Sequence, residues 1–238
     1  LAQLPIAGLR RNSTQMYDML IRMIDKQGSS IIPSEFLPAA ERNNLMIDLD
    51  RWMIKSSMEF CTRYAAEKVF VRLSLQSMQD PSLVPWMREK VVALNVDPSC
   101  LVIQIPEQSA AKYIKETKAK VEELRAIEVK FALEHYCVNT SRLHILDILR
   151  PDYIKIDGTL MHSLVTDAVL QESVRLLTCA AAERNIETIA ERVENANAMA
   201  VLFQLGVHFM QGHYVHEPEV VLQESSNFAN LLEASSAK

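Results

Sequence analysis

Polar side chains that can bind metal ions or anions follow most of the short apolar runs of this chain. They are Arg22, Arg72 with Ser74, Gln104 with Glu107, Glu134 with His135, Lys155 with Asp157, Glu191 with Glu194, and Gln211. Carboxylate and amide oxygens are ligands for divalent ions, whereas a guanidinium fork suits phosphate oxygens. The set therefore indicates a ring of polar side chains around a candidate site, if the fold brings the ends of these runs together.

The apolar runs themselves predict a barrel. Eight short runs cover residues 4–6, 19–24, 69–73, 101–105, 129–133, 153–156, 188–190 and 207–210. Helical patterns of apolar residues at three-to-four spacing cover residues 38–43, 47–67, 81–94, 110–126 and 171–185. This alternation is typical of a parallel sheet built from βα units, and eight repeats favour a (β/α)₈ TIM-like barrel with its site at the carboxyl ends of the strands. An open doubly wound sheet is the alternative, but it normally carries a glycine-rich first turn.

The length of the chain predicts one domain that spans residues 1–238. Two successive helical patterns between residues 29 and 67 make the repeat irregular. The first strand begins almost at Leu1, which indicates a fragment of a longer multidomain protein. After Pro218 the chain is polar, with one amphipathic stretch at 228–234 that we expect to pack on the outside.

Composition excludes several classes of partner. The chain has 25 basic and 30 acidic residues, a formal net charge of −5, and no basic run, so nucleic acid is not expected as a partner. Its four cysteines form no C-x-x-C pair, which indicates a reducing, cytoplasmic environment. No segment approaches the roughly 20 apolar residues of a membrane span. The five glycines form no phosphate-binding loop, so a phosphate would have to meet arginines, helix N-termini or ordinary backbone amides.

Four motifs occur in order along the chain. Residues 32–36 read I-P-S-E-F ahead of Ala40 and Glu41, residues 152–157 read D-Y-I-K-I-D, residues 190–194 read A-E-R-V-E, and residues 210–212 read M-Q-G ahead of Tyr214 and Pro218. They resemble the S-P-x-x-F…A-E, D-x-x-K-I-D, A-E-G-V-E and Q-G-Y…P motifs of the EAL domain family, the cyclic di-GMP phosphodiesterases. The resemblance extends over essentially the whole chain and implies an EAL-type barrel.

The same alignment shows departures at the positions that bind metal in the family. The signature tripeptide E-A-L falls on Asp18, Met19 and Leu20, the asparagine of N-L-S falls on Arg72, and the first glutamate of E-L-T-E falls on Gln104. Residues 134–142 read E-H-Y-C-V-N-T-S-R where the family has D-D-F-G-T-G-Y-S-S. In the first strand, leucine stands where the family motif Y-Q-P-I has glutamine, which implies weaker ligand binding.

These departures predict that the chain is not an enzyme. Hydrolysis of a phosphodiester by two divalent ions needs hard oxygen ligands around both ions. Arg72 places a permanent positive charge where a dication would lie, Gln104 and His135 each remove a negative charge, and Asp18 is shorter than glutamate. We therefore expect no metal, no required cofactor and no catalytic residue.

Groups that the resemblance assigns to the dinucleotide persist. It places Arg22 on a phosphate, and a planar guanidinium fork at a strand end suits that role. The expected ligand-binding residues are Leu20, Ile21, Arg22, Pro33, Asp50, Arg72, Glu191, Gln211 and Gly212. Arg72 is included on the hypothesis that it meets the second phosphate in place of the ions. The chain thus resembles FimX-type receptors, which implies cyclic di-GMP as ligand, a PilZ-domain protein as partner, and a role in type IV pilus or motility control.

Other interpretations remain open. A slow phosphodiesterase would use Asp18, Glu134 and Glu191 around one ion, and a ligand-free scaffold would keep the barrel only to dock another protein. Arg22 alone is also compatible with a solvated cation. For Lys155 we expect a buried ion pair with Glu134 or Glu191 rather than a catalytic role.

Overall fold

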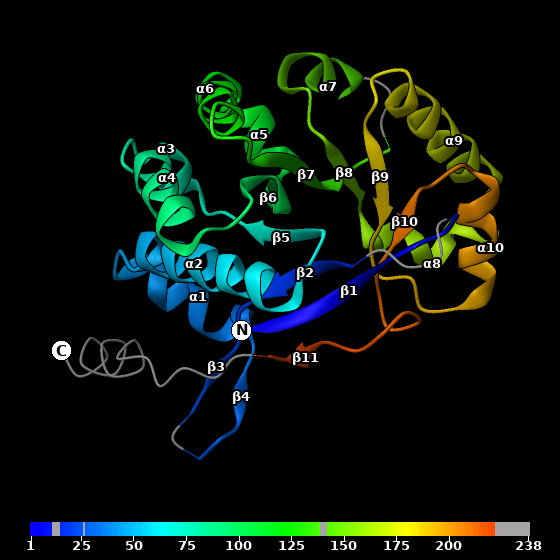
Figure 1. Ribbon diagram of the computed structural model, residues 1–238. Coiled ribbons are helices and arrows are strands. Elements are labelled where there is room, and N and C mark those ends of the chain that lie inside the picture. The colour runs from blue at the N-terminus through cyan, green and yellow to red at the C-terminus, as the bar shows by residue number, and fades with distance from the viewer. Residues whose placement is uncertain (11–14, 26, 139–141, 222–238) are drawn as a thin grey trace.

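The computed structural model describes residues 1–10, 15–25, 27–138 and 142–221 (Figure 1). Eight strands form a barrel, which closes because the last of them pairs with the first. They are β1 Ala2–Gly8, β2 Met16–Leu20, β5 Lys68–Arg72, β6 Leu101–Pro106, β7 Lys130–Tyr136, β8 Tyr153–Ile156, β9 Glu187–Ala190 and β10 Phe209–Met210. A further strand, β11 Glu219–Val220, pairs with the start of β1. The predicted (β/α)₈ TIM-like barrel is confirmed.

The expectation of a wholly parallel sheet is wrong at the first strand. β1 runs antiparallel to β2 and to β10, whereas β2, β5, β6, β7, β8, β9 and β10 pair in parallel. Only residues 9–15 connect β1 to β2. A parallel crossover needs a dozen or more residues, so this connection permits only an antiparallel neighbour.

The second predicted strand, residues 19–24, is also corrected. β2 ends at Leu20, and Met23–Ile24 forms a separate short strand, β3, which pairs with β4 at Ser30–Ile31. A tight turn joins β3 to β4, in which Asp25 Oδ1 accepts from the backbone N–H groups of Gln27 and Ser29 at 2.8 Å each. The hairpin extends away from the barrel (Figure 1). Arg22 therefore lies in the break between β2 and β3.

Helices surround the barrel (Figure 1). They are α1 Pro33–Arg42, α2 Met46–Tyr64, α3 Leu75–Gln79, α4 Leu83–Leu94, α5 Glu107–Lys112, α6 Ile114–Arg125, α7 Leu143–Leu149, α8 Met161–Leu164, α9 Ala168–Ala182 and α10 Ala196–Gln204, with short 3₁₀ helices at Pro98–Cys100 and Gly158–Leu160. The two helices in succession before β5 confirm the predicted irregularity, and the predicted helix at 110–126 is broken at Tyr113. The stretch at 228–234 lies outside the described residues.

The barrel interior is filled rather than open. One buried side chain from each barrel strand contributes to an inner apolar cluster, formed by Ile6, Met16, Phe70, Val102, Ala132, Tyr153, Ile189 and Phe209. Phe70 and Tyr153 meet edge to face, with ring centroids 5.1 Å apart. A layer of this kind makes the barrel interior a packed core, which supports the side chains at the carboxyl ends of the strands. Within the described ranges, no helix is long and apolar enough to cross a membrane.

Candidate functional site

The seven parallel strands end on one side of the barrel, and we call this end the mouth. The residues that the sequence placed after the strands gather there, because carboxyl ends of parallel strands share one edge. Asp18, Gln104, Glu134, Lys155, Glu191 and Gln211 are all buried at this end. The predicted convergence of polar side chains is therefore present.

Asp18 is the centre of the first polar group at the mouth. Its Oδ1 accepts a hydrogen bond of 2.8 Å from Gln104 Nε2, and its Oδ2 accepts one of 3.1 Å from Gln211 Nε2. The fully buried Lys155 places Nζ 2.8 Å from Asp18 Oδ2 and 4.8 Å from the ring centroid of Phe70. Both carboxylate oxygens of Asp18 thus face donors from three other strand ends.

The expected pairing of Lys155 with Glu134 or Glu191 is wrong, because those two carboxylates are already engaged. Arg72 meets Glu134 through a two-pronged contact, with Nε 2.5 Å from Oε1 and Nη2 2.7 Å from Oε2. His135 Nδ1 lies 3.1 Å from Glu191 Oε2. Lys155 instead reaches across the barrel interior to Asp18.

His135 connects the ion pair of Arg72 and Glu134 to Glu191. Its Nε2 lies 2.9 Å from Arg72 Nη2. A guanidinium can only donate, so Nε2 accepts and Nδ1 carries the proton that faces Glu191. The contact with Glu191 raises the pKa of His135, while burial and the charge of Arg72 oppose the rise. Burial raises the pKa of Glu134, against the opposing charge of Arg72.

Several of the residues expected around the first phosphate and base lie at the end of β2, the strand that also carries Asp18. Leu20 ends β2 and Ile21 follows it, both partly buried. Arg22 is half-buried and donates from Nη1 to the carbonyl of Ile21 at 2.9 Å, which leaves most of its donors free of partners in the described chain. Pro33 is the first residue of α1. Leu20, Ile21 and Arg22 are thus consecutive at the end of β2, and Pro33 follows the hairpin formed by β3 and β4.

Asp50 has a contact that the sequence did not predict. It is buried in α2, and its Oδ2 accepts from the backbone N–H of Ser74 at 2.8 Å. Burial raises its pKa, although hydrogen bonds from Ser74 and Ser77 oppose the rise. Asp50 therefore holds the turn that follows Arg72.

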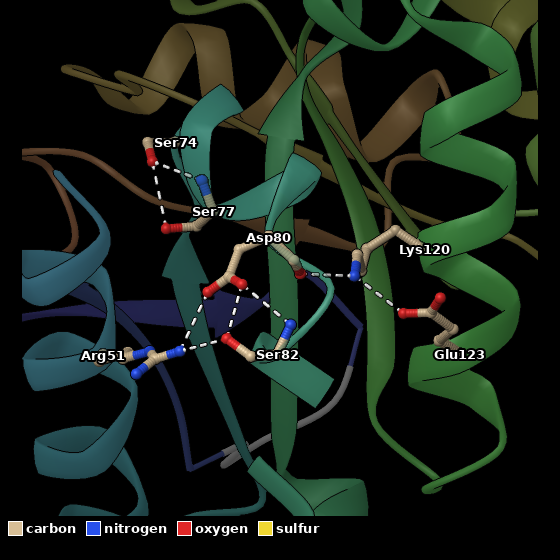
Figure 2. A network of polar contacts seen from close by, with 7 residues as sticks. All are labelled: Arg51, Ser74, Ser77, Asp80, Ser82, Lys120 and Glu123. Carbon is tan, nitrogen blue, oxygen red and sulfur yellow. Dashed lines mark hydrogen bonds and ion pairs between the residues drawn. The ribbon is translucent and has the colours of Figure 1, made fainter. Parts of the chain in front are cut away.

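Arg51, which follows Asp50 in α2, holds the other end of the segment that contains α3. Arg51 Nη2 donates to Asp80 Oδ2 at 3.0 Å, and Lys120 of α6 donates to the Asp80 carbonyl at 2.9 Å (Figure 2). At the front of α3, Ser74 Oγ accepts from the N–H of Ser77 at 3.2 Å. The short helix α3 is thus fixed at both ends, and with it the position of Arg72.

Glu191 and Gln211 follow β9 and β10, and Gly212 comes next. Gly212 has φ of +147°, and a Cβ atom there would lie 2.4 Å from the backbone N of Val193 and 2.5 Å from its O. The backbones after β9 and β10 therefore approach too closely for any side chain at position 212. This gives Gly212 a packing role, whether or not it also touches a ligand.

Two arginines at the mouth were not predicted. Arg142 donates from Nη1 to Oε1 of the fully buried Glu107 at 2.6 Å, a pair separated by 35 positions in the sequence. Arg192 is exposed and has φ of +53°. The sequence carried a signal for Arg192, since it stands where the A-E-G-V-E motif has glycine, but spacing gave none for the Arg142 pair.

The fold and the mouth define an α/β barrel of mixed strand direction, with a charged site at the carboxyl ends of its parallel strands. In the part of the chain that the structure describes, no three His, Cys, Asp or Glu side chains converge in a way that could hold a metal ion. Residues 1–218 match the EAL domain family model, and the chain belongs to this family. The resemblance seen in the sequence is confirmed.

Solved structures similar to the chain include EAL domains in complex with c-di-GMP, and similar curated proteins include some named as phosphodiesterases. A crystal structure of the FimX EAL domain from Pseudomonas aeruginosa bound to c-di-GMP is 32% identical with a TM-score of 0.86, covering 92% of this chain and 89% of that one. The Xanthomonas citri FimX EAL domain in complex with c-diGMP shares the fold at 23% identity and a TM-score of 0.86, covering 94% and 89%. "Probable cyclic di-GMP phosphodiesterase PdeA" of Escherichia coli (strain K12) is 24% identical over 215 residues, which are 89% of this chain and 30% of that protein. The chain thus spans about a third of the length of such curated relatives.

Proposed function

We propose that this chain is a cytoplasmic receptor domain that binds cyclic di-GMP and does not hydrolyse it. The similarity to two FimX EAL domains, both solved with this dinucleotide, supports the ligand. The ligand would lie over the mouth and meet Leu20, Ile21, Arg22, Pro33, Asp50, Arg72, Glu191, Gln211 and Gly212. The phosphates would be bound by arginines, because a guanidinium fork replaces a metal ion as the partner of phosphate oxygens.

The observation that carries the non-enzymatic part of the proposal is the pairing of the mouth carboxylates with cations. Asp18 faces Lys155 and two amide N–H donors, and Glu134 faces the fork of Arg72. A dication would have to displace these groups or lie beside permanent positive charges, which the Coulomb term opposes. The donor set does not fit a pair of divalent ions, so we propose no hydrolytic step.

The role of Arg72 at a phosphate has to be compatible with its ion pair, because its fork is engaged. Its side chain is 54% exposed whereas Glu134 is 1% exposed. If Arg72 left Glu134, a buried carboxylate would remain without its cation. Arg72 therefore meets the ligand through its outer edge while it keeps Glu134, and Arg72→Ala should weaken binding. Unchanged affinity in that variant would remove Arg72 from the ligand set.

One experiment tests receptor, enzyme and scaffold together. Cyclic di-GMP is titrated by calorimetry in the presence of a chelator and again with excess Mg²⁺ or Mn²⁺, and each sample is then assayed by chromatography for the linear dinucleotide. Binding that is independent of metal, without product, is the expected result. Arg22→Ala should weaken this binding, and Arg88→Ala, which removes an arginine from the outer helix α4, is the matched control.

The alternatives give different outcomes. Product in the metal-containing sample would support the slow phosphodiesterase built on Asp18, Glu134 and Glu191, an activity that the name of the Escherichia coli relative favours. No binding in either condition would leave a docking scaffold.

The receptor would relay its ligand state to a protein. By analogy with the FimX-type resemblance, we propose a PilZ-domain protein as that partner and type IV pilus or motility control as the pathway. The test is binding of a purified PilZ-domain protein with and without cyclic di-GMP. Equal binding in the two conditions would contradict a relay.

A further inference from the structure

Arg192 adopts a backbone conformation that costs free energy for any residue with a side chain. Its φ of +53° lies in the left-handed region, which glycine adopts readily and arginine does not. It follows β9 by two residues, and it stands where the family motif has glycine. Unfavourable backbone conformations persist where the surroundings impose them, often at ligand sites.

The surroundings of Arg192 impose both its backbone and its side-chain position. A Cβ atom on Gly158 would lie 2.6 Å from Cγ and 2.7 Å from Cδ of Arg192, so the alkyl part of the arginine lies directly against the Gly158 backbone. On the other side, a Cβ atom on Gly212 would lie 2.9 Å from the carbonyl carbon of Arg192. The residue is therefore packed between the loops that follow β8 and β10, while it remains exposed overall.

Arg192 differs from three other cations at the mouth, because each of those has a carboxylate partner. Arg72 pairs with Glu134, Arg142 with Glu107, and Lys155 with Asp18. Arg192 makes no hydrogen bond or ion pair within the described ranges.

Its electrostatic influence reaches Asp157, at the end of β8. Burial raises the pKa of Asp157, but hydrogen bonds from Thr159 and the charges of His135 and Arg192 bring it below the ordinary value. The guanidinium thus lies near Asp157 at the mouth, although within the described ranges it forms no ion pair.

We propose that Arg192 binds one phosphate of the cyclic dinucleotide together with the outer edge of Arg72, on the side of the mouth away from Arg22, which binds the other phosphate. The proposal rests on the proposed function, because it deepens the same site. Arg22 follows β2 and Arg192 follows β9, with β1 and β10 between them in the barrel. A cyclic dinucleotide carries two phosphodiester charges, and these two arginines supply two positive charges that form no ion pair in the part of the chain that the structure describes.

The test compares Arg192→Gly with Arg150→Gly. Glycine at position 192 removes the guanidinium and relieves the left-handed backbone, so loss of binding cannot be attributed to added strain. Arg150 is also an exposed arginine with positive φ, +48°, but it precedes β8 and so lies at the barrel end opposite the mouth. Calorimetry with cyclic di-GMP should show about tenfold weaker binding for Arg192→Gly, the size expected for one charge-assisted hydrogen bond, and wild-type affinity for Arg150→Gly.

Salt dependence and a charge-preserving variant identify the chemistry of the contact. Arg192→Lys should retain part of the affinity, and Arg192→Gly should reduce the slope of log affinity against log salt, whereas Arg150→Gly should not. Wild-type affinity in Arg192→Gly would overturn the proposal while leaving the receptor intact. Weaker binding with an unchanged salt slope would also overturn it, because it would assign the arginine to a base. Absence of binding by the wild-type chain would instead refute the proposed function itself.

Discussion

Lys155 is a fully buried cation whose only ion pair, among the described residues, is with Asp18. Lys155→Met should lower the free energy of unfolding by about 3–5 kcal/mol, because it leaves a buried carboxylate without its cation. The measurement is urea unfolding at neutral pH. In the double variant Asp18→Leu/Lys155→Met most of this loss should disappear, since no buried charge remains. Equal losses in the single and double variants would show that the pair does not matter for stability.

The cations at the mouth also make a prediction about metals. Arg72→Asn combined with Gln104→Glu restores two residues of the family motifs and removes the fork from Glu134. This double variant should gain a Mn²⁺-dependent rise in Tm, because binding to the folded state alone stabilises it, whereas the wild-type chain should show none. Arg184→Asn breaks another two-pronged pair, with Asp147, and is the matched control. A Mn²⁺ response of the wild-type chain would count against the receptor proposal.

Two consecutive residues of α2, Asp50 and Arg51, form hydrogen bonds at the two ends of α3. The carboxyl group of Asp50 is titratable. The pKa of Asp50 is raised above 3.8 chiefly by burial. A carboxyl group with a raised pKa binds its proton more tightly when folded, so its contribution to stability is present in acid and is lost as pH rises from 3.8 through the raised value.

The prediction is that Asp50→Asn gains stability relative to the wild type as pH increases. Asparagine keeps an oxygen for the Ser74 N–H but carries no charge to bury. Urea unfolding measured in steps of pH from about pH 4 upward gives the difference between the two proteins, which should grow as pH rises. Asp48→Asn, on the same helix, is the control and should show no such change. A difference that does not vary with pH would mean that Asp50 titrates normally.

The loops after β9 and β10 depend on a backbone contact at Gly212. Gly212→Ala should destabilise the fold by more than the roughly 1–2 kcal/mol of a left-handed alanine, because its methyl group would meet the Val193 backbone. Gly28→Ala is the matched control: Gly28 also has positive φ, +86°, but a methyl group there would have nothing within 4 Å. Thermal unfolding should rank Gly212→Ala well below Gly28→Ala, and equal values would contradict a steric role.

At the scale of the whole molecule, the barrel and its polar mouth could be predicted because both are local signals. Each parallel strand is a short apolar run, and mouth residues such as Glu134, Glu191 and Gln211 directly follow one. The direction of β1 could not be read in this way, because an apolar run such as 4–6 is the same in either direction. Only the shortness of the connection to β2 indicates the reversal.

Side-chain contacts between different strands and helices could not be predicted from the sequence either. Lys155 and Asp18 lie on β8 and β2, far apart in sequence, and which carboxylate meets the lysine depends on Arg72 having taken Glu134. The contact of Asp50 with Ser74 likewise depends on how α2 packs against the end of β5. Such contacts follow from three-dimensional packing, which spacing along one chain does not encode.

The reversed first strand has a consequence for anything attached to the barrel. Because β1 runs against its neighbours, Ala2 pairs with Leu20 at the mouth, and Val221 donates its N–H to the Leu1 carbonyl at 3.0 Å. Both the first and the last described residues therefore stand at the rim where the ligand would enter. A fluorescent reporter joined before Leu1 would lie beside the proposed ligand site, so this geometry makes the domain suited to a sensor that reads occupancy directly.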